Sequence, residues 1–578
     1  MGYRMFVMVL LTICVGVMDG MGLTMFLPLF QIAADASSEA DSTIVDDNFM
    51  VSLMQSLHIP VDLWGILGLM LSFYIIKGIF NFFKTRYNTD IARYFMLRTR
   101  KRLLAAFNQI SYKYFVSANV GRIQNIMTGE LTTVYNAFIQ YINIVQQVIM
   151  IAIYMGFAIV INAQFAIFIT IGALLFNFIF KKIYKVTKES SRSRVTASNT
   201  YQGLIIQFVN NFKYLKATGL FEHYSHKVND SIEAIEIESR KMGYMGAIAN
   251  AIREPTLILI VCAVILLHVY GFGGNLGTIM VSLLFFYRAL TAVTFLQMSM
   301  NTFNTMVGTI ENVEWFENEL LANREVHAGK KDIGKLTDQL TLENVDFSYG
   351  TQQILKNINL KVFVNKTTAI VGESGSGKTT LVNILSGLFP IENGDYTIDG
   401  IPAKEVDLKN FQKQIGYISQ DPVIFNDTIY NNVTFWATYT PQNIQRFKNA
   451  LQRAALLEFV SDLTNQENTL LGNNGVNLSG GQKQRISIAR ELFKEAQILI
   501  FDEATSALDS GTEKTIQHHI DMLKGDYTII IIAHRMATIK NVDNIIYLEQ
   551  GRIIAEGGFD ELIKKSTTFK SMVESQNI

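Results

Sequence analysis

The chain is poor in cysteine and proline, and one long segment has no charged residue at all. Cys14 and Cys262 are the only cysteines among 578 residues, and both lie within apolar runs, so no disulfide framework is expected. Residues 131–180 contain no Asp, Glu, Lys or Arg. Soluble domains carry charge throughout, at about a quarter of their residues. The absence of charge therefore excludes a purely soluble protein and predicts helices that lie in lipid.

Long apolar runs recur through the first half of the chain. A helix needs about 20 mostly apolar residues to cross the hydrocarbon core of a bilayer. Six segments are predicted to do so: 5–30, 63–83, 138–161, 165–180, 247–270 and 276–300. The first run is too long for the core of a secretory signal and has no small-residue cleavage site. It is therefore interpreted as a membrane helix.

The segments between these runs differ in the sign of their charge. Residues 31–61 include five acidic residues and no Lys or Arg, whereas residues 84–102 are rich in Lys and Arg. Positive residues are retained on the cytoplasmic side, so both termini are predicted to be cytoplasmic. Residues 103–114 show apolar positions at helical spacing, which predicts that the helices continue beyond the membrane.

Five charged residues lie inside the predicted spans: Asp19, Lys77, Arg253, Glu254 and Arg288. Placing one charge at the bilayer centre costs about 2.5–3.5 kcal/mol, so each needs a reason. Lys77 can extend its ammonium group toward the cytoplasmic end of its helix, and Arg253 and Glu254 can pair locally. Arg288 has apolar residues on both sides and is expected to face a water-filled cavity or a partner.

The second half of the chain has the composition of an ordinary soluble domain. From about residue 340, short β-branched runs alternate with helical stretches, which predicts an α/β fold with a parallel sheet. The run Gly372-Glu373-Ser374-Gly375-Ser376-Gly377-Lys378-Thr379 lies between a predicted strand and a predicted helix. Backbone N–H groups of such a loop cradle phosphates, Lys378 reaches the β- and γ-phosphates, and the Thr379 hydroxyl binds Mg²⁺.

Two further strands end in residues that can act on a nucleotide. Residues 498–501 form a buried strand that leads into Asp502 and Glu503. Asp502 is predicted to bind Mg²⁺ through water, and Glu503 is placed to polarise the attacking water. A second strand, residues 528–532, is followed by His534. Structural roles for the two carboxylates are the alternative, but the flanking sequence favours the catalytic interpretation.

The segment Leu478-Ser479-Gly480-Gly481-Gln482 lies between the phosphate loop and Asp502. In this order, the motifs resemble those of ATP-binding-cassette (ABC) transporters of the exporter type. The resemblance covers about 240 residues and implies that ATP and Mg²⁺ are the ligands. It also implies that Ser479, Gly480, Gly481 and Gln482, which we name the signature segment, contact ATP held by a second cassette.

The resemblance assigns roles to further residues. Tyr349 resembles the aromatic residue that stacks on adenine, and Gln420 resembles the Q-loop glutamine that links Mg²⁺ and the attacking water to the membrane domain. Asp509 resembles a residue of the D-loop, and His534 the switch histidine that contacts the γ-phosphate. Ser374, Gly375, Ser376, Thr379 and Thr380 complete the expected nucleotide contacts. The family usually has a glutamate before the signature segment where this chain has Asn473, which puts one coupling contact in doubt.

The expected architecture is a membrane all-α domain of six helices followed by a cytoplasmic α/β P-loop ATPase domain. The predicted boundaries are 1–315 for the membrane domain, 316–339 for a linker and 340–578 for the ATPase. In ABC exporters, short tip helices dock on the ATPase, and by position they are expected near 120–127 and 210–218. A surface loop without a coupling role is the alternative. One cassette makes half a transporter, so a homodimer is expected, with a heterodimer as the alternative.

The cargo is inferred from the first and last spans. Asp19, Gly22, Leu23 and Pro28, together with residues 287–290, resemble bacterial lipid-linked-oligosaccharide flippases of the inner membrane. Asp19 stands where Glu is expected, and Ala292 where Pro is common nearby. Lys77, Arg253 and Arg288 are the cations expected to meet a pyrophosphate headgroup. The alternative is a multidrug or peptide exporter, and the apolar spans exclude a soluble ATPase acting on nucleic acid.

Overall fold

The computed structural model describes the backbone of residues 2–29, 49–161, 163–266, 276–325, 329–503, 510–533 and 536–576. The chain forms two compact units. Unit 1 comprises Met1–Ile110 and Ser117–Arg324, and unit 2 comprises Ser111–Val116 and Glu325–Ile578. The short segment Ser111–Val116 therefore groups with unit 2, although the chain on both sides of it belongs to unit 1.

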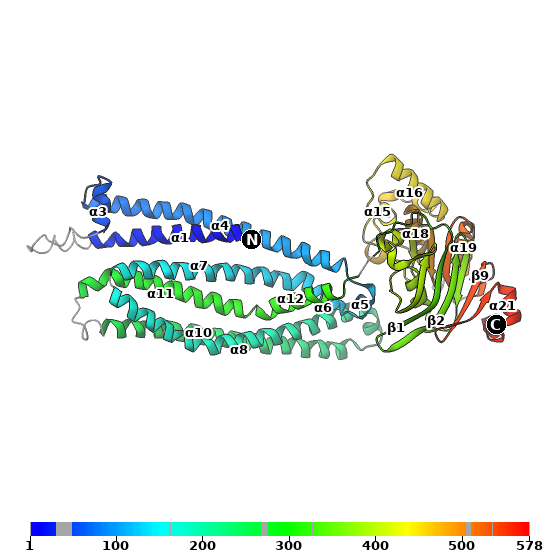
Figure 1. Ribbon diagram of the computed structural model, residues 1–578, viewed down its shortest axis with the longest axis horizontal. Coiled ribbons are helices and arrows are strands. Elements are labelled where there is room, and N and C mark those ends of the chain that lie inside the picture. Colours follow the sequence, from blue (N-terminus) through cyan, green and yellow to red (C-terminus); the bar gives the residue numbers. More distant parts are fainter. Residues whose placement is uncertain are drawn as a thin grey trace, which may run out of the picture. The chain divides into compact units, whose positions relative to one another are not determined.

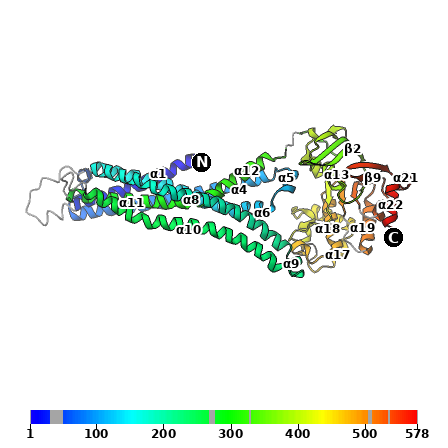
Figure 2. The same ribbon diagram turned by 90° about the horizontal axis from the view of Figure 1, so that it is seen from below.

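Unit 1 is built from long helices, several of which run side by side (Figures 1 and 2). The close pairs are α8 with α10, α7 with α11 and α1 with α4. The helices are α1 (Gly2–Thr24), α3 (Phe49–Ser56), α4 (Leu63–Phe107), α6 (Val120–Asn125), α7 (Leu131–Ile161), α8 (Ala163–Asn210), α9 (Phe212–Ala217), α10 (Phe221–Leu266), α11 (Leu276–Asn304) and α12 (Val307–Ala322), with a π-helical turn at Ile126–Glu130.

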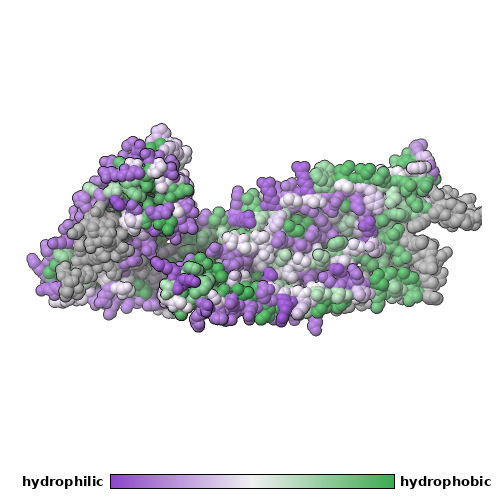
Figure 3. All heavy atoms as spheres, turned by 180° about the vertical axis from the view of Figure 1, so that it is seen from behind, coloured by the Kyte–Doolittle hydropathy of each residue, from purple (hydrophilic) through white to green (hydrophobic). Residues whose placement is uncertain are grey.

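Five helical stretches among the described residues are long and apolar enough to cross a membrane: Gly2–Leu29, Leu63–Phe107, Val120–Val160, Phe221–Ala263 and Leu283–Asn304. They overlap five of the six spans expected from the sequence. The remaining span, 165–180, lies within α8, where most side chains fall outside the described residues. Hydrophobic residues gather toward the end of unit 1 that carries α3 on the face drawn in Figure 3.

The long helices exceed what a bilayer requires. Helix α4 has 45 residues, and at 1.5 Å per residue it is about 68 Å long. The hydrocarbon core is only about 30 Å thick. The expectation that helices continue beyond the membrane is therefore supported by helix length.

The short helices correct one expectation about the tips. Helix α9 (Phe212–Ala217) lies where the second tip was expected. The first tip was expected at 120–127, but the residues that group with unit 2 are Ser111–Val116, which include all of α5 (Tyr112–Ser117) except its last residue. Helix α6 instead packs on α8, where a Cβ on Gly121 would lie 2.7 Å from the Gly203 Cα. Two glycines thus let the backbones meet, and periodicity alone does not reveal such a contact.

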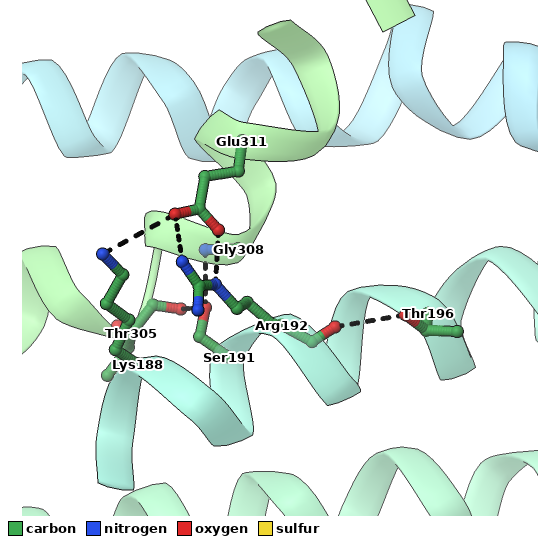
Figure 4. Close-up of polar contacts among 7 residues, drawn as sticks. All are labelled: Lys188, Ser191, Arg192, Thr196, Thr305, Gly308 and Glu311. Atoms are coloured by element: carbon green, nitrogen blue, oxygen red, sulfur yellow. Dashed lines mark hydrogen bonds and ion pairs between the residues drawn. The ribbon is translucent and has the colours of Figure 1, made fainter. Parts of the chain in front are cut away.

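Helix α12, the last helix of unit 1, is fastened to α8 by a compact set of polar contacts (Figure 4). Ser191 donates its hydroxyl to the Thr305 carbonyl at 2.7 Å and accepts the Gly308 N–H at 3.1 Å. Arg192 forms two 2.6 Å hydrogen bonds with the Glu311 carboxylate. A Cβ on Gly308 would lie 2.6 Å from the Ser191 carbonyl oxygen, so only glycine allows this close approach.

Unit 2 contains two sheets. The six-stranded sheet has the order β10-β9-β3-β8-β7-β6, in which β10 is antiparallel to β9 and the other neighbours are parallel. The four-stranded sheet has the order β2-β1-β4-β5 and is antiparallel. The strands are β1 (Gln339–Tyr349), β2 (Gln352–Phe363), β3 (Thr367–Val371), β4 (Asn393–Ile398), β5 (Ile401–Pro402), β6 (Ile415–Ile418), β7 (Ile498–Asp502), β8 (Thr528–Ile532), β9 (Asn544–Glu549) and β10 (Arg552–Gly557).

Helices surround the parallel sheet. They are α13 (Lys378–Leu385), α14 (Leu408–Lys413), α15 (Ile429–Thr434), α16 (Pro441–Arg453), α17 (Leu457–Ser461), α18 (Gly480–Phe493), α19 (Ser510–Leu523), α20 (Met536–Ile539), α21 (Phe559–Lys565) and α22 (Thr567–Gln576).

The parallel strands are apolar along their whole length because both faces of the sheet are covered. In β8, Ile529 and Ile531 join the core that contains residues of α16 and α18, whereas Ile530 and Ile532 join the core that contains residues of β1 and β2. A membrane helical domain joined to an α/β domain was expected, and this fold is confirmed.

Candidate functional site

The loop 372–377 joins β3 to α13 in a conformation that requires its glycines. The φ angles are +154° at Gly372, +81° at Gly375 and +105° at Gly377. A Cβ on Gly372 would lie 2.0 Å from the Leu548 carbonyl oxygen, and one on Gly377 would lie 2.8 Å from Leu355. The pattern read from the sequence therefore forms a tight loop at the carboxyl end of a parallel strand, with a helix beginning at Lys378.

Lys378 bends back over this loop. Its ammonium group donates hydrogen bonds to the carbonyls of Gly372 and Glu373, each at 2.9 Å. Burial lowers the pKa of Lys378, while the carboxylates of Glu503 and Asp502 act in the opposite direction. The two carboxylates predicted from the sequence therefore lie within electrostatic reach of the lysine. This arrangement places the ammonium group of Lys378 where phosphates are expected.

Polar groups at the same loop suit a phosphate and its metal ion. The Ser376 hydroxyl is buried and has no hydrogen-bond partner among the described residues. A buried polar group normally has a partner, and a phosphate oxygen would supply one. Ser374 and Thr379 are exposed, whereas Thr380 is buried. The residues present therefore fit a nucleotide phosphate at this helix N-terminus.

Asp502 ends β7, and Glu503 follows in an unusual backbone conformation. The Tyr417 hydroxyl, from the neighbouring strand β6, donates a 2.8 Å hydrogen bond to Asp502 Oδ2. Burial is the main cause that raises the pKa of Tyr417, and the nearby Asp502 and Tyr112 act in the same direction. The phenol therefore keeps its proton at neutral pH. Glu503 has a φ of +50°, and its N–H donates to the Ile532 carbonyl at 3.2 Å. Gln420 is exposed just after β6.

Tyr417 is a residue that the sequence interpretation missed. The signal was present in the strand pattern, because side chains two residues apart share one face of a strand. In the parallel register, Tyr417 pairs with Ile500, and Ile500 shares its face with Asp502. Finding the contact required the order of the strands, which the sequence did not supply.

The signature segment forms the start of α18. Ser479 is the N-cap residue, and its hydroxyl accepts the Gln482 N–H at 3.3 Å. The Gln482 side-chain oxygen accepts the Ser479 N–H at 2.8 Å, which completes a reciprocal capping box. Ser479 and Gly480 are exposed, Gly481 is buried, and Asn473 in the preceding loop is exposed. The helix therefore presents its N-terminus to the outside of the unit.

Tyr349 ends β1 and is partly buried. Its ring meets Phe347 edge-on at 5.2 Å and Phe389 edge-on at 5.6 Å. Asp509 and His534 lie outside the described residues, so the structure gives no geometry for them.

The charged residues of unit 1 are distributed differently from what the sequence indicated. Lys77 was expected either to extend toward the cytoplasm or to face a headgroup. Its ammonium group instead lies 2.6 Å from Asp19 Oδ1, and Tyr154 donates a hydrogen bond of 2.5 Å to Asp19 Oδ2. Arg288 interacts electrostatically with Tyr154 and Tyr74. These residues bring together α1, α4, α7 and α11.

Arg253 lies on α10 and is half-buried. Its Nε atom is buried and has no hydrogen-bond partner within the described parts of the chain. Glu254 is exposed. Of the three cations expected to face a headgroup, Lys77 and Arg288 both lie near Tyr74.

Comparison with known proteins identifies the family. The family described as "ABC transporter" matches residues 355–506, and "ABC transporter transmembrane region" matches residues 5–300. An ATP-dependent lipid A-core flippase from Francisella tularensis is 38% identical over 251 residues, which are 43% of this chain and 41% of that protein. The chain thus aligns with less than half of the length of that relative.

Longer matches are less identical. A second ATP-dependent lipid A-core flippase, from Ralstonia nicotianae, is 26% identical over 88% of this chain and 87% of its own length. The heterocyst differentiation ATP-binding protein HepA of Nostoc is 28% identical over 85% of this chain and 80% of its own length.

A solved structure shares the fold. The structure of a bacterial Atm1-family ABC exporter with ATP bound has a TM-score of 0.80 and 21% identity, and the match covers 100% of this chain and 98% of the other. The match to the transmembrane region alone spans just over half of the 578 residues. The chain therefore belongs to the ABC transporter family.

Proposed function

We propose that the chain hydrolyses ATP and uses it to flip a glycolipid with a phosphate-bearing headgroup, such as a lipid-linked pyrophosphate oligosaccharide, across a bacterial inner membrane. The observation that carries the ATPase part is that Lys378 bonds to the glycine loop and lies within electrostatic reach of Asp502 and Glu503. A cation for phosphate and two carboxylates for a metal ion and a water are what phosphoryl transfer requires.

Within this site, each residue has a separate task. The loop N–H groups and Lys378 hold the phosphates, and Tyr349 supplies an aromatic ring on which the base stacks. The oxygens of Thr379, Asp502 and Gln420 suit Mg²⁺, a hard cation that prefers oxygen ligands. Bound Mg²⁺ would neutralise charge on the phosphates. Glu503 orients the attacking water, with His534 and Asp509 completing the site.

The exposed signature segment supports a pair of identical chains. A capped helix N-terminus is a ready anion site, and in this unit it faces outward. Apolar side chains are also exposed on both units: Phe212 and Tyr214 on α9 are 52% and 61% exposed, and Phe435 and Trp436 in unit 2 are 56% and 51% exposed. A second copy would cover such surfaces and bring its signature segment to the ATP. ATP then favours the closed pair, because both chains contact it.

The cargo is inferred from charge in the helical unit. Lys77 is already paired with Asp19, so an anionic headgroup has to compete with a carboxylate for it. Arg288 forms no ion pair with a described residue and has phenols for neighbours, which leaves it the more available cation. Two of the relatives are named ATP-dependent lipid A-core flippases, that is, for a lipid cargo, which supports the choice of a lipid substrate. Both termini and unit 2 are expected on the cytoplasmic side.

The test uses the full-length protein in proteoliposomes. ATP hydrolysis and headgroup translocation are measured with a polyprenyl-pyrophosphate saccharide, a lipid A-type glycolipid, and a panel of drugs and peptides. We expect the phosphate-bearing glycolipids to stimulate hydrolysis and to be translocated. Stimulation and transport by the drug or peptide panel alone would contradict the proposal and favour a multidrug or peptide exporter.

The variant Arg288→Ala sharpens this test. We expect translocation to be lost while basal ATP hydrolysis persists, because the headgroup loses its cation and unit 2 is unchanged. The matched control is Arg86→Ala, an exposed arginine on α4, which should leave both activities intact. Normal translocation by Arg288→Ala would remove the headgroup argument.

A further inference from the structure

The hydrogen bond between Tyr417 and Asp502 joins two strands at the edge of the nucleotide site. Tyr417 lies in β6 and Asp502 at the end of β7, which are adjacent and parallel. The phenol donates to Oδ2 at 2.8 Å, so this oxygen is fixed in direction. The remaining lone pairs of the carboxylate stay available to a metal ion or its water. A partner of this kind orients a metal-binding carboxylate.

The phenol itself is held firmly in place. Tyr417 packs, partly buried, against the core that contains Ile500 and Phe389. Its backbone is set by the register that pairs it with Ile500. Because the Tyr417 ring is packed and its hydroxyl is hydrogen-bonded, the side chain has little conformational freedom. The Asp502 carboxylate that accepts this hydrogen bond is therefore held in one orientation.

On its other side, Tyr417 lies near the segment Ser111–Val116. The phenol of Tyr112 is close enough to act electrostatically on Tyr417. The Tyr112 ring stacks on Phe389 with 5.5 Å between ring centres and 27° between ring planes. Lys113 is paired with Glu392 at 2.9 Å and lies over the Phe347 ring. This segment joins two stretches of unit 1 in the chain, yet it packs with unit 2.

We propose that Tyr417 is a positioning residue that holds Asp502 ready for Mg²⁺, and that the seating of Tyr112 on unit 2 governs how well it does so. The inference deepens the proposed ATPase site and rests on it. A movement of the cytoplasmic segment would then alter metal affinity at Asp502, through the phenol and without any contact between the segment and the nucleotide.

The first experiment removes only the hydroxyl, with Tyr417→Phe in the full-length protein. Binding of ATP without metal is measured in EDTA, and Mn²⁺ binding to the ATP-loaded protein is measured by electron paramagnetic resonance. We expect ATP binding in EDTA to be unchanged and Mn²⁺ affinity to fall about 10-fold, the lower end of the loss seen when an outer partner of a metal ligand is removed. The Mg²⁺ concentration for half-maximal hydrolysis should rise in parallel, with a smaller change in kcat.

The control is Tyr396→Phe. The Tyr396 hydroxyl is buried and donates to the Leu385 carbonyl at 2.7 Å, so this variant also loses a buried hydrogen bond of unit 2. It should change thermal stability and leave Mn²⁺ affinity unaltered. An unaltered Mn²⁺ affinity in Tyr417→Phe, with ATP still bound, would overturn the inference. If the unmodified protein neither binds nor hydrolyses Mg²⁺-ATP, the proposed function itself fails, which is a separate outcome.

The second experiment tests the segment. Tyr112→Ala should lower Mn²⁺ affinity as well, and Tyr112→Phe, which keeps the stacked ring, should lower it less. In a double-mutant cycle, the effect of Tyr112→Ala should largely vanish once Tyr417 is phenylalanine, because residues that act through one contact are not additive. Fully additive losses would show that Tyr112 does not act through Tyr417.

Discussion

The ammonium group of Lys77 lies 2.6 Å from the carboxylate of Asp19, and the Asp19 side chain is only 2% exposed. The two residues come from α1 and α4, and Tyr154 adds a contact from α7. A carboxylate buried this deeply is retained as a charge only if partners surround it. The pair therefore ties the first two membrane helices together at a polar point within an apolar bundle.

The first prediction concerns this pair. Lys77→Met should lower the free energy of unfolding by about 3 kcal/mol, because it leaves a buried charge without its counterion. The double variant Asp19→Asn with Lys77→Met should recover most of that loss. Thermal unfolding in detergent measures both. Arg86→Met, at an exposed position of α4, is the control, and a double variant as unstable as Lys77→Met would contradict the pairing.

The second prediction concerns Glu503. The isosteric change Glu503→Gln should leave ATP binding intact and reduce turnover at least about 100-fold, the typical contribution of a group that takes a proton in the transition state. Filter binding of ATP and release of phosphate measure the two steps. Glu343→Gln, at an exposed position of β1, should hydrolyse normally. Near-normal turnover by Glu503→Gln would remove this residue as the base.

The third prediction concerns the junction drawn in Figure 4. Gly308→Ala should destabilise the protein by about 1–3 kcal/mol, because the new methyl group would meet the rigid backbone of Ser191. Gly243→Ala is the matched control, since a Cβ there meets no atom within 4 Å. In a helix interior, that change should stabilise by up to about 1 kcal/mol. Equal melting temperatures for the two variants would contradict the close approach.

The fourth prediction concerns pH. The hydrogen bond from Lys113 is the main cause that lowers the pKa of Glu392 below its usual value. Because the folded pKa is the lower one, the pair stabilises the fold above the ordinary pKa of a glutamate, and this stabilisation is lost as pH falls through the folded pKa. Both side chains are more than a third exposed, so the gain at pH 7 should not exceed about 0.5 kcal/mol.

The comparison of the unmodified protein with Glu392→Gln measures this effect. Their difference in thermal stability should be present at pH 7 and disappear near pH 3. A Glu392→Gln difference that grows on acidification would contradict the direction of the shift.

The sequence predicted best those features that depend on neighbours along the chain. The glycines at 372, 375 and 377 need positive φ wherever such a loop occurs, and Ser479 with Gln482 forms a cap from residues three positions apart. The alternation of strands and helices likewise gave the α/β fold. In each case, the structure is determined by residues that are close together in the sequence.

Contacts between distant residues were not predictable in the same way. Asp19 and Lys77 are 58 positions apart, and Tyr417 and Asp502 are 85 positions apart. Each pairing depends on how one element is rotated against another, which helical or strand periodicity does not specify. The first tip was expected by position alone, and neither the close approach of Gly121 to Gly203 nor the grouping of Ser111–Val116 with unit 2 follows from position.

The grouping of Ser111–Val116 with unit 2 also bears on how this ATPase can be studied. A polypeptide excised at the linker and produced alone would lack Tyr112 and Lys113, so Phe389 would lose its covering ring and Glu392 its cation. Phe389 would then be more exposed in the fragment than in the full chain, and an exposed aromatic surface of this kind favours aggregation. Kinetic measurements on such a fragment would describe an ATPase unit without the segment Ser111–Val116, which packs with it in the full chain.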